Sequence, residues 1–91
     1  MDIEIIENSK NKMIFRLKDE DYTFCNLLKE ALLNEEDVTL ATFNIAHPLK
    51  RVPEFIVETK GKTSPKEALI NASKNMKKEL EKFSKAFEKA V

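Results

Sequence analysis

Apolar residues recur along this chain with two different periods, alternation in some segments and helical spacing in others, and the two periods separate strands from helices. Residues 3–5 and 13–17 alternate between apolar and polar side chains, which is the period of a half-buried strand. The polar run 8–11 between them predicts a turn, and therefore a hairpin. Residues 38–45, rich in β-branched and aromatic side chains, and residues 54–60, which alternate again, predict a second pair of strands.

Two other stretches have the spacing of amphipathic helices. Residues 24–32 place apolar side chains on one face at i, i+3, i+4, i+7 and i+8, and Thr23 is a suitable N-cap. The second helix is predicted over 65–90. Ser64 is its expected N-cap, proline occupies the first helical position, and Glu67 completes a capping box.

The resulting order is β-β-α-β-β-α, which belongs to the α+β class. A small four-stranded antiparallel sheet with two helices on one face buries all these apolar faces most simply. We therefore expect one domain over residues 1–91, with a long C-terminal helix.

Composition limits the classes of protein that fit. A single cysteine excludes a disulfide framework, and no apolar run approaches the length of a signal sequence or a membrane span, so we expect a cytoplasmic location. The formal net charge is zero, but residues 1–45 carry ten acidic against five basic side chains and residues 46–91 carry six against eleven. A lysine-rich solvated helix explains this better than a nucleic-acid surface does.

Candidate catalytic residues are few. Cys25 near a helix start could be a reactive thiol, but the acidic run 19–21 opposes a thiolate, and no spacing rule brings His47 beside it. One cysteine and one histidine do not supply a metal site, and the acidic run 35–37 lacks the pattern of a calcium loop. Gly61, the only glycine, excludes a glycine-rich phosphate loop and is expected to serve the turn into the second helix. We expect no catalytic residue, metal or cofactor.

The second helix is too long for its sheet. Its 26 residues would extend roughly 39 Å, against about 17–23 Å for the strands. Its apolar positions nevertheless continue at steps of 4-3-4-3-4, as in a coiled-coil seam that contains Leu69, Ser73, Met76, Leu80, Phe83 and Phe87. The last three would lie past the sheet, and covering them with a partner is worth roughly 5–8 kcal/mol before association costs. The chain is thus predicted to be an interaction subunit.

Three motifs in register carry a resemblance to a known family. They are the acidic-aromatic entry "DYTF-x-NLL" to the first helix, the pair His47-Pro48, and the run from Thr59 to Pro65. Over residues 21–87 the chain resembles the archaeal RNA polymerase subunit L family, the counterpart of the small eleventh subunit of eukaryotic RNA polymerase II. The family usually has histidine where Tyr22 stands and often glycine where Cys25 stands, which speaks against a required thiol.

The resemblance implies a fold like the dimerisation part of the bacterial polymerase α subunit. It implies a heterodimer with the larger archaeal D subunit, on which subunits N and P and the large catalytic subunits assemble. The role would be architectural, with the magnesium site in other chains.

Combined with the seam, this predicts a partner interface of six residues: Leu28, Leu32, Met76, Leu80, Phe83 and Phe87. The seam also allows self-association of the isolated chain. The alternative function is a small nucleic-acid-binding module that uses its lysine-rich last helix, in which seven lysines are interleaved with four glutamates over 65–91.

Overall fold

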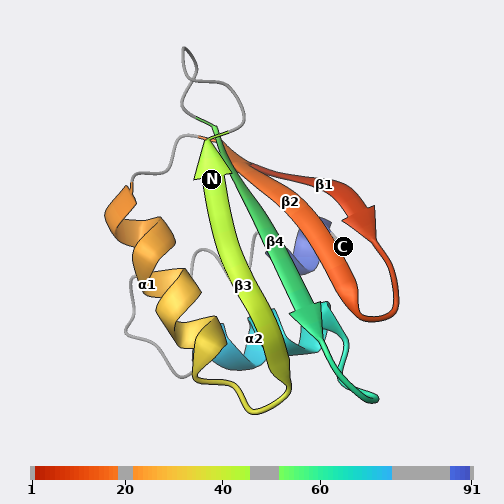
Figure 1. The fold of residues 1–91 in the computed structure, drawn as a ribbon. Helices are drawn as coiled ribbons and strands as arrows, with labels where there is room; N and C mark the ends of the chain where they lie inside the picture. Colours follow the sequence, from red (N-terminus) through yellow and green to blue (C-terminus); the bar gives the residue numbers. More distant parts are fainter. Residues whose placement is uncertain (1, 19–21, 46–51, 75–86, 91) are drawn as a thin grey trace.

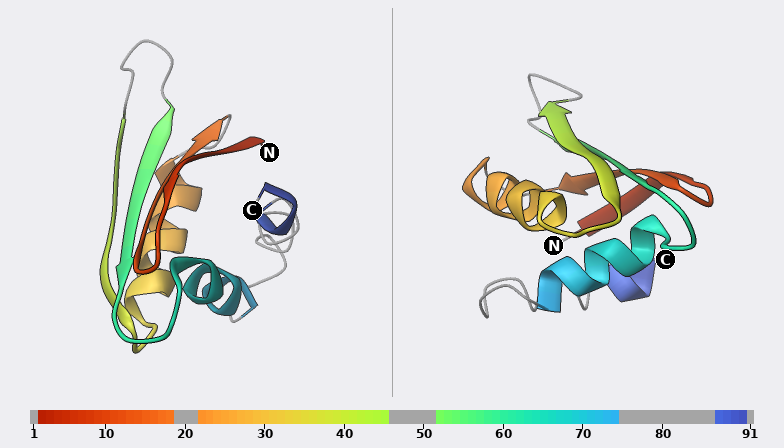
Figure 2. Two further views of the ribbon diagram at one scale, coloured as in Figure 1. Left: turned by 90° about the vertical axis from the view of Figure 1, so that its right-hand side faces the viewer. Right: turned by 60° about the horizontal axis from the view of Figure 1, so that its bottom comes forward.

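The computed structural model describes residues 2–18, 22–45, 52–74 and 87–90. Its elements follow the expected order (Figure 1): β1 (Asp2–Asn8), β2 (Lys12–Lys18), α1 (Tyr22–Leu33), β3 (Val38–Ile45), β4 (Pro53–Thr59) and α2 (Pro65–Lys74). The four strands form one antiparallel sheet in the order β1-β2-β4-β3. Both helices lie on the same side of this sheet (Figure 2).

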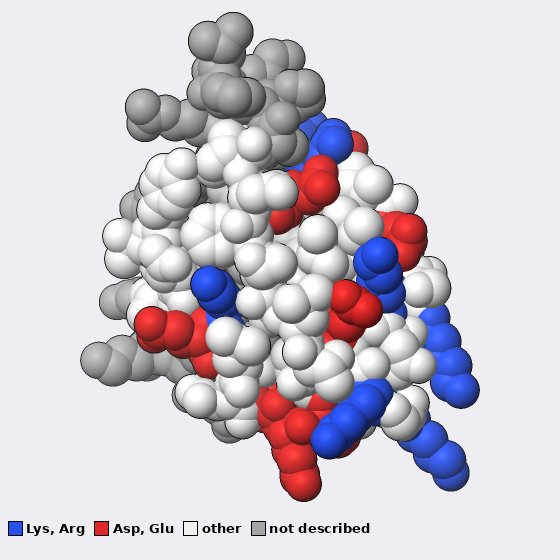
Figure 3. All heavy atoms as spheres, in the orientation of Figure 1, with Lys and Arg blue, Asp and Glu red and all other residues white. Residues whose placement is uncertain are grey.

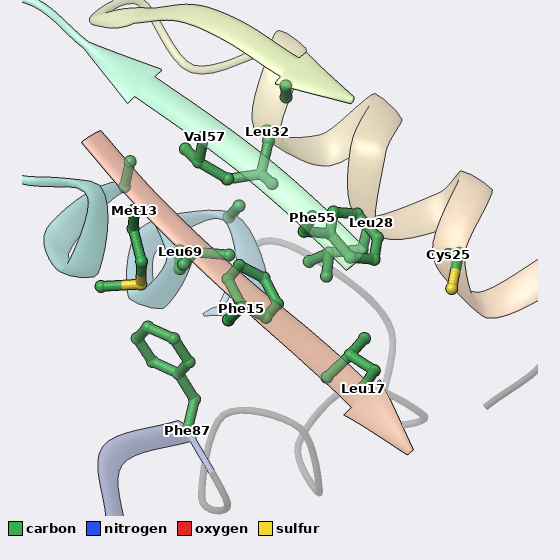
Figure 4. Close-up of a cluster of buried hydrophobic side chains, with 13 residues drawn as sticks. Met13, Phe15, Leu17, Cys25, Leu28, Leu32, Phe55, Val57, Leu69 and Phe87 are labelled. Atoms are coloured by element: carbon green, nitrogen blue, oxygen red, sulfur yellow. The ribbon is translucent and has the colours of Figure 1, made fainter. Parts of the chain in front are cut away.

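Alternation along the two central strands separates the two faces of the sheet. Every second residue of β2 and β4 is buried, and these side chains meet the inner faces of α1 and α2 in one core. The larger apolar side chains of that core are labelled, with Cys25, in Figure 4: Met13, Phe15, Leu17, Leu28, Leu32, Phe55, Val57, Leu69 and Phe87. The half-buried strand period expected from the sequence is thus confirmed.

A row of aromatic rings crosses the helix-covered face of the sheet. Phe15, Phe55 and Phe43 are cross-strand neighbours on β2, β4 and β3, and their ring centroids stack 5.2 Å apart at both steps. Tyr22 of α1 extends the row at one end, with its centroid 6.2 Å from that of Phe43. Phe87 extends it at the other end, edge-on to Phe15 at 5.9 Å. Such geometry adds to the stabilisation that burial of the rings already provides.

The start of α2 is held by the turn of the first hairpin. The Asn11 side-chain amide donates to Thr59 Oγ1 and to the carbonyl of Gly61, both at 3.2 Å. Thr59 Oγ1 in turn donates to the carbonyl of Thr63 at 2.7 Å. Gly61 has φ of 69°, a backbone conformation that residues other than glycine rarely adopt. Its predicted role in this turn is confirmed.

The start of α2 agrees with the prediction from the sequence, whereas the start of α1 differs from it. Ser64 Oγ accepts a hydrogen bond from the backbone N–H of Glu67 at 3.1 Å, as an N-cap does, and Pro65 is the first residue of α2. α1, however, already includes Tyr22, so Thr23 lies in its first turn and is not the N-cap. Propensity patterns place helix ends only to within one or two residues.

The other face of the sheet has no helix over it among the described residues. A small ion-pair network lies there, in which Arg16 Nε is 3.0 Å from Glu54 Oε2, Arg16 Nη1 is 3.7 Å from Glu4 Oε1, and Lys18 Nζ is 3.6 Å from Glu4 Oε2. These groups are partly exposed, so each pair contributes little to stability. They make this face polar, whereas the core lies on the opposite face of the sheet.

Candidate partner interface

Part of the apolar face of α1 packs into the core, and part of it remains at the surface. Leu28 and Leu32, both expected at the interface, are fully buried inside the chain's own core. Beside them Phe24 and Ala31 are half-buried, and Leu27 is 40% exposed. Residues 24, 27 and 31 are spaced by three and four, so they share one flank of the helix. This flank, rather than Leu28 and Leu32, presents apolar surface to a partner.

Phe87 lies in a different place from the one that the helix length suggested. Its side chain has no exposed area and packs edge-on against Phe15, close to Met13 (Figure 4). Residue 87 therefore lies over the sheet in this structure and not past its end. The physical reason is that the seam's aromatic side chain finds the apolar ring of Phe15 within its own chain, so no second chain is needed to cover it. Its membership of a partner interface stays a prediction.

The rest of the seam is described only in part. Leu69 is buried, and Ser73, also buried, donates from its hydroxyl to the carbonyl of Leu69 at 2.7 Å. The seam's one polar member is thereby satisfied inside the helix. Met76, Leu80 and Phe83 lie outside the described residues, as does the middle of the predicted long helix.

Of the two residues considered for a thiol site, the structure describes one. Cys25 is fully buried in the core, and His47 lies outside the described residues. Within the described ranges, no three side chains of the metal-binding types are grouped so as to hold an ion. No helix there is long and apolar enough to cross a membrane.

The acidic run 35–37 lines a small pocket of about 170 Å³ with Thr63, Glu67 and Asn71. Thr63 Oγ1 donates to Asp37 Oδ2 at 2.6 Å, which ties the pocket wall to the loop before α2. This contact joins the residue before β3 to the loop before α2. No sequence pattern predicts the pocket, because residues 35–37 and 63–71 are brought together only by the fold.

A scan against protein families finds one that matches most of the chain. Residues 12–86 match the family described as the RNA polymerase Rpb3/Rpb11 dimerisation domain. The match begins at β2 and extends through both helices. It therefore covers the sheet's two central strands and the apolar flank of α1.

Curated relatives and a solved structure agree with this family. A DNA-directed RNA polymerase subunit Rpo11 of Pyrococcus furiosus is 40% identical, and the match covers 100% of this chain and 98% of that protein. The Rpo11 subunit of Natronomonas pharaonis is 32% identical, with 100% of each chain covered. The crystal structure of DNA-directed RNA polymerase subunit L from Thermoplasma acidophilum superposes with a TM-score of 0.73 at 26% identity, covering 96% of this chain and 85% of that one.

Proposed function

The chain belongs to the Rpb3/Rpb11 dimerisation-domain family of RNA polymerase subunits, and on this premise we propose that it is a non-catalytic subunit of an archaeal DNA-directed RNA polymerase. Its task in this proposal is architectural. It pairs with a larger subunit of the same fold family, and the pair supports assembly of the subunits that carry out nucleotidyl transfer during transcription.

The observation that carries the proposal is the family match over both helices together with the uncovered flank of α1. Phe24, Leu27 and Ala31 form an apolar strip at the border of a complete core. A partly exposed apolar strip beside a buried core is typical of a protein–protein contact. The strip offers apolar contact, which suits the binding of another protein chain.

The finer parts of the proposal come from the resemblance in the sequence. The larger partner is the archaeal D subunit, and subunits N and P and the large catalytic subunits join the pair that it forms with this chain. Met76, Leu80 and Phe83 contribute to the heterodimer contact together with the flank of α1, whereas Phe87 packs on Phe15 within this chain. The chain acts in the cytoplasm as one domain over residues 1–91.

Leu27→Asp tests the interface. Leu27 is 40% exposed, so a carboxylate there should leave the fold intact, but it would place an unpaired charge in the apolar contact. We expect loss of the one-to-one heterodimer with the D subunit, measured as the light-scattering mass of the mixture, with the circular dichroism spectrum unchanged.

Leu40→Asp is the matched control. Leu40 is 38% exposed and lies on β3, away from the apolar flank of α1. The control chain should still bind the D subunit. Wild-type chain that fails to bind the D subunit would contradict the function, whereas equal binding by both variants would contradict only the assignment of the α1 flank.

A further inference from the structure

Three loops meet at one end of the sheet and are held together by hydrogen bonds. The turn between β1 and β2 contacts the loop between β4 and α2, since the Asn11 side-chain amide donates to the carbonyl of Gly61 at 3.2 Å. That loop also contacts the segment before β3, since the Lys60 backbone N–H donates to the carbonyl of Asp37 at 2.9 Å. Figures 1 and 2 show the three segments side by side. The fold therefore fixes their relative positions.

Two of these loops carry lysines. One pair flanks Asn11 and the other flanks Gly61, fifty residues away along the chain. The fold brings the two pairs into one group, which we call the lysine cluster: Lys10, Lys12, Lys60 and Lys62. Three of them are exposed and Lys12 is half-buried. None of them forms an ion pair among the described residues, whereas Lys18 at the other end of β2 pairs with Glu4 at 3.6 Å.

The third loop carries acidic residues beside this cluster. Together with one residue from the first turn of α2 they form what we call the acidic group: Glu35, Glu36, Asp37 and Glu67. Thr63 Oγ1 donates to Asp37 Oδ2 at 2.6 Å, which ties the acidic group to the loop that carries two of the lysines. Figure 3 shows acidic and basic side chains next to each other along the lower edge of the molecule, where Figure 1 has these loops. This end of the sheet thus presents both signs of charge from loops whose backbones are joined.

The mixture of signs indicates the kind of partner. A nucleic acid is negative throughout, so the lysine cluster would attract it while the adjacent acidic group repelled it. A folded protein can place acidic groups opposite the lysines and basic groups opposite the acids, and such complementarity fixes the orientation of a partner and excludes wrong partners. The formal net charge of the chain is zero, so no overall attraction competes with this local pattern.

We propose that this end of the sheet docks another subunit of the polymerase, a folded protein whose surface carries the opposite pattern of charge. The choice of a polymerase subunit rests on the proposed function, in which the chain and its larger partner support the assembly of further subunits. The docking surface shares no residue with the apolar flank of α1, so the two contacts do not compete for the same side chains. Charge complementarity sets the orientation of the docked subunit and the rate at which it binds.

Two single substitutions at exposed residues, Lys62→Gln and Glu36→Gln, each remove one charge of the pattern. Each variant is paired with the D subunit, and the dissociation constant between this pair and the large catalytic subunits is measured by biolayer interferometry. Both variants should bind about threefold more weakly, because each removes one half of the complementary pattern. High salt should reduce the difference from wild type, because it screens the attraction.

Two double substitutions that keep the net charge at zero separate the pattern of charge from its total. Lys62→Glu with Glu36→Lys inverts the docking surface, whereas Lys18→Glu with Glu4→Lys inverts an exposed ion pair at the other end of β2. The first should weaken binding of the large subunits at least about tenfold. The second should change it less than about twofold. Circular dichroism and binding of the D subunit should be unchanged in both.

The sign of the Glu36→Gln effect tests the partner class. Tighter binding by Glu36→Gln with weaker binding by Lys62→Gln would mean that the partner surface is negative throughout, which would overturn the proposal. Duplex DNA that binds the wild-type pair and is released by Lys62→Gln would assign the surface to nucleic acid instead. Equal effects of the two double substitutions would also overturn the proposal. A wild-type chain that does not pair with the D subunit contradicts the proposed function itself, whereas unchanged assembly of the inverted variant contradicts only this docking surface.

Discussion

Among single residues, Gly61 is one whose replacement should destabilise the fold through its backbone conformation and not through packing. It has φ of 69°, and a Cβ placed there would meet no atom within 4 Å. Gly61→Ala should therefore lower the free energy of unfolding by about 1 kcal/mol through backbone strain alone. Gly61→Asn should cost less, because asparagine tolerates the left-handed region. Urea unfolding measures both, and equal stability of wild type and Gly61→Ala would contradict the strain.

Among the elements, β2 has neighbouring residues on the two faces of the sheet, one covered by the helices and one not covered by any helix among the described residues. Met13 is fully buried under the helices, while Ile14 is half-buried on the face that has no helix over it among the described residues. Met13→Ala should cost about 2–5 kcal/mol of unfolding free energy, because it leaves a cavity. Ile14→Ala should cost about 1 kcal/mol, because less apolar area returns to water. Denaturant unfolding at constant m-value distinguishes the two, and similar losses would contradict the one-sided core.

The elements also show what sequence patterns can predict. Residues 38–45 form β3 as predicted, and 54–60 differ from β4 by one residue at each end, because alternation is a local property of the chain. The partner of each strand is not local, so the pairing of β2 with β4 was not predicted. For the same reason the seam predicted that Phe87 must be buried against another apolar side chain. It did not predict that this side chain is Phe15 of the same chain. The exposed flank at Leu27 was hidden within the apolar face of α1, which periodicity alone does not divide into core and border.

At the scale of the whole molecule, Phe87 connects the last described turn, residues 87–90, to the sheet. If this packing stabilises the isolated chain, Phe87→Ala should lower its free energy of unfolding by about 3 kcal/mol. Glu88→Ala, an exposed neighbour, should change it by less than about 0.5 kcal/mol. Thermal and urea unfolding of the isolated chain measure both. If Phe87→Ala leaves the stability unchanged but abolishes binding to the D subunit, Phe87 belongs to the partner interface, as its spacing in the sequence predicts.

The strand order has a consequence for the time course of folding. β1 with β2 and β3 with β4 are neighbours along the chain, but the sheet is joined at its centre by β2 and β4, where Phe15 faces Phe55 across forty residues of sequence. Each outer pair can form by a short search, whereas the central junction must wait for the closure of a long loop. A ribosome therefore has to release β4 before the core can close, so the completed fold, and any surface offered to a partner, arises only late in synthesis.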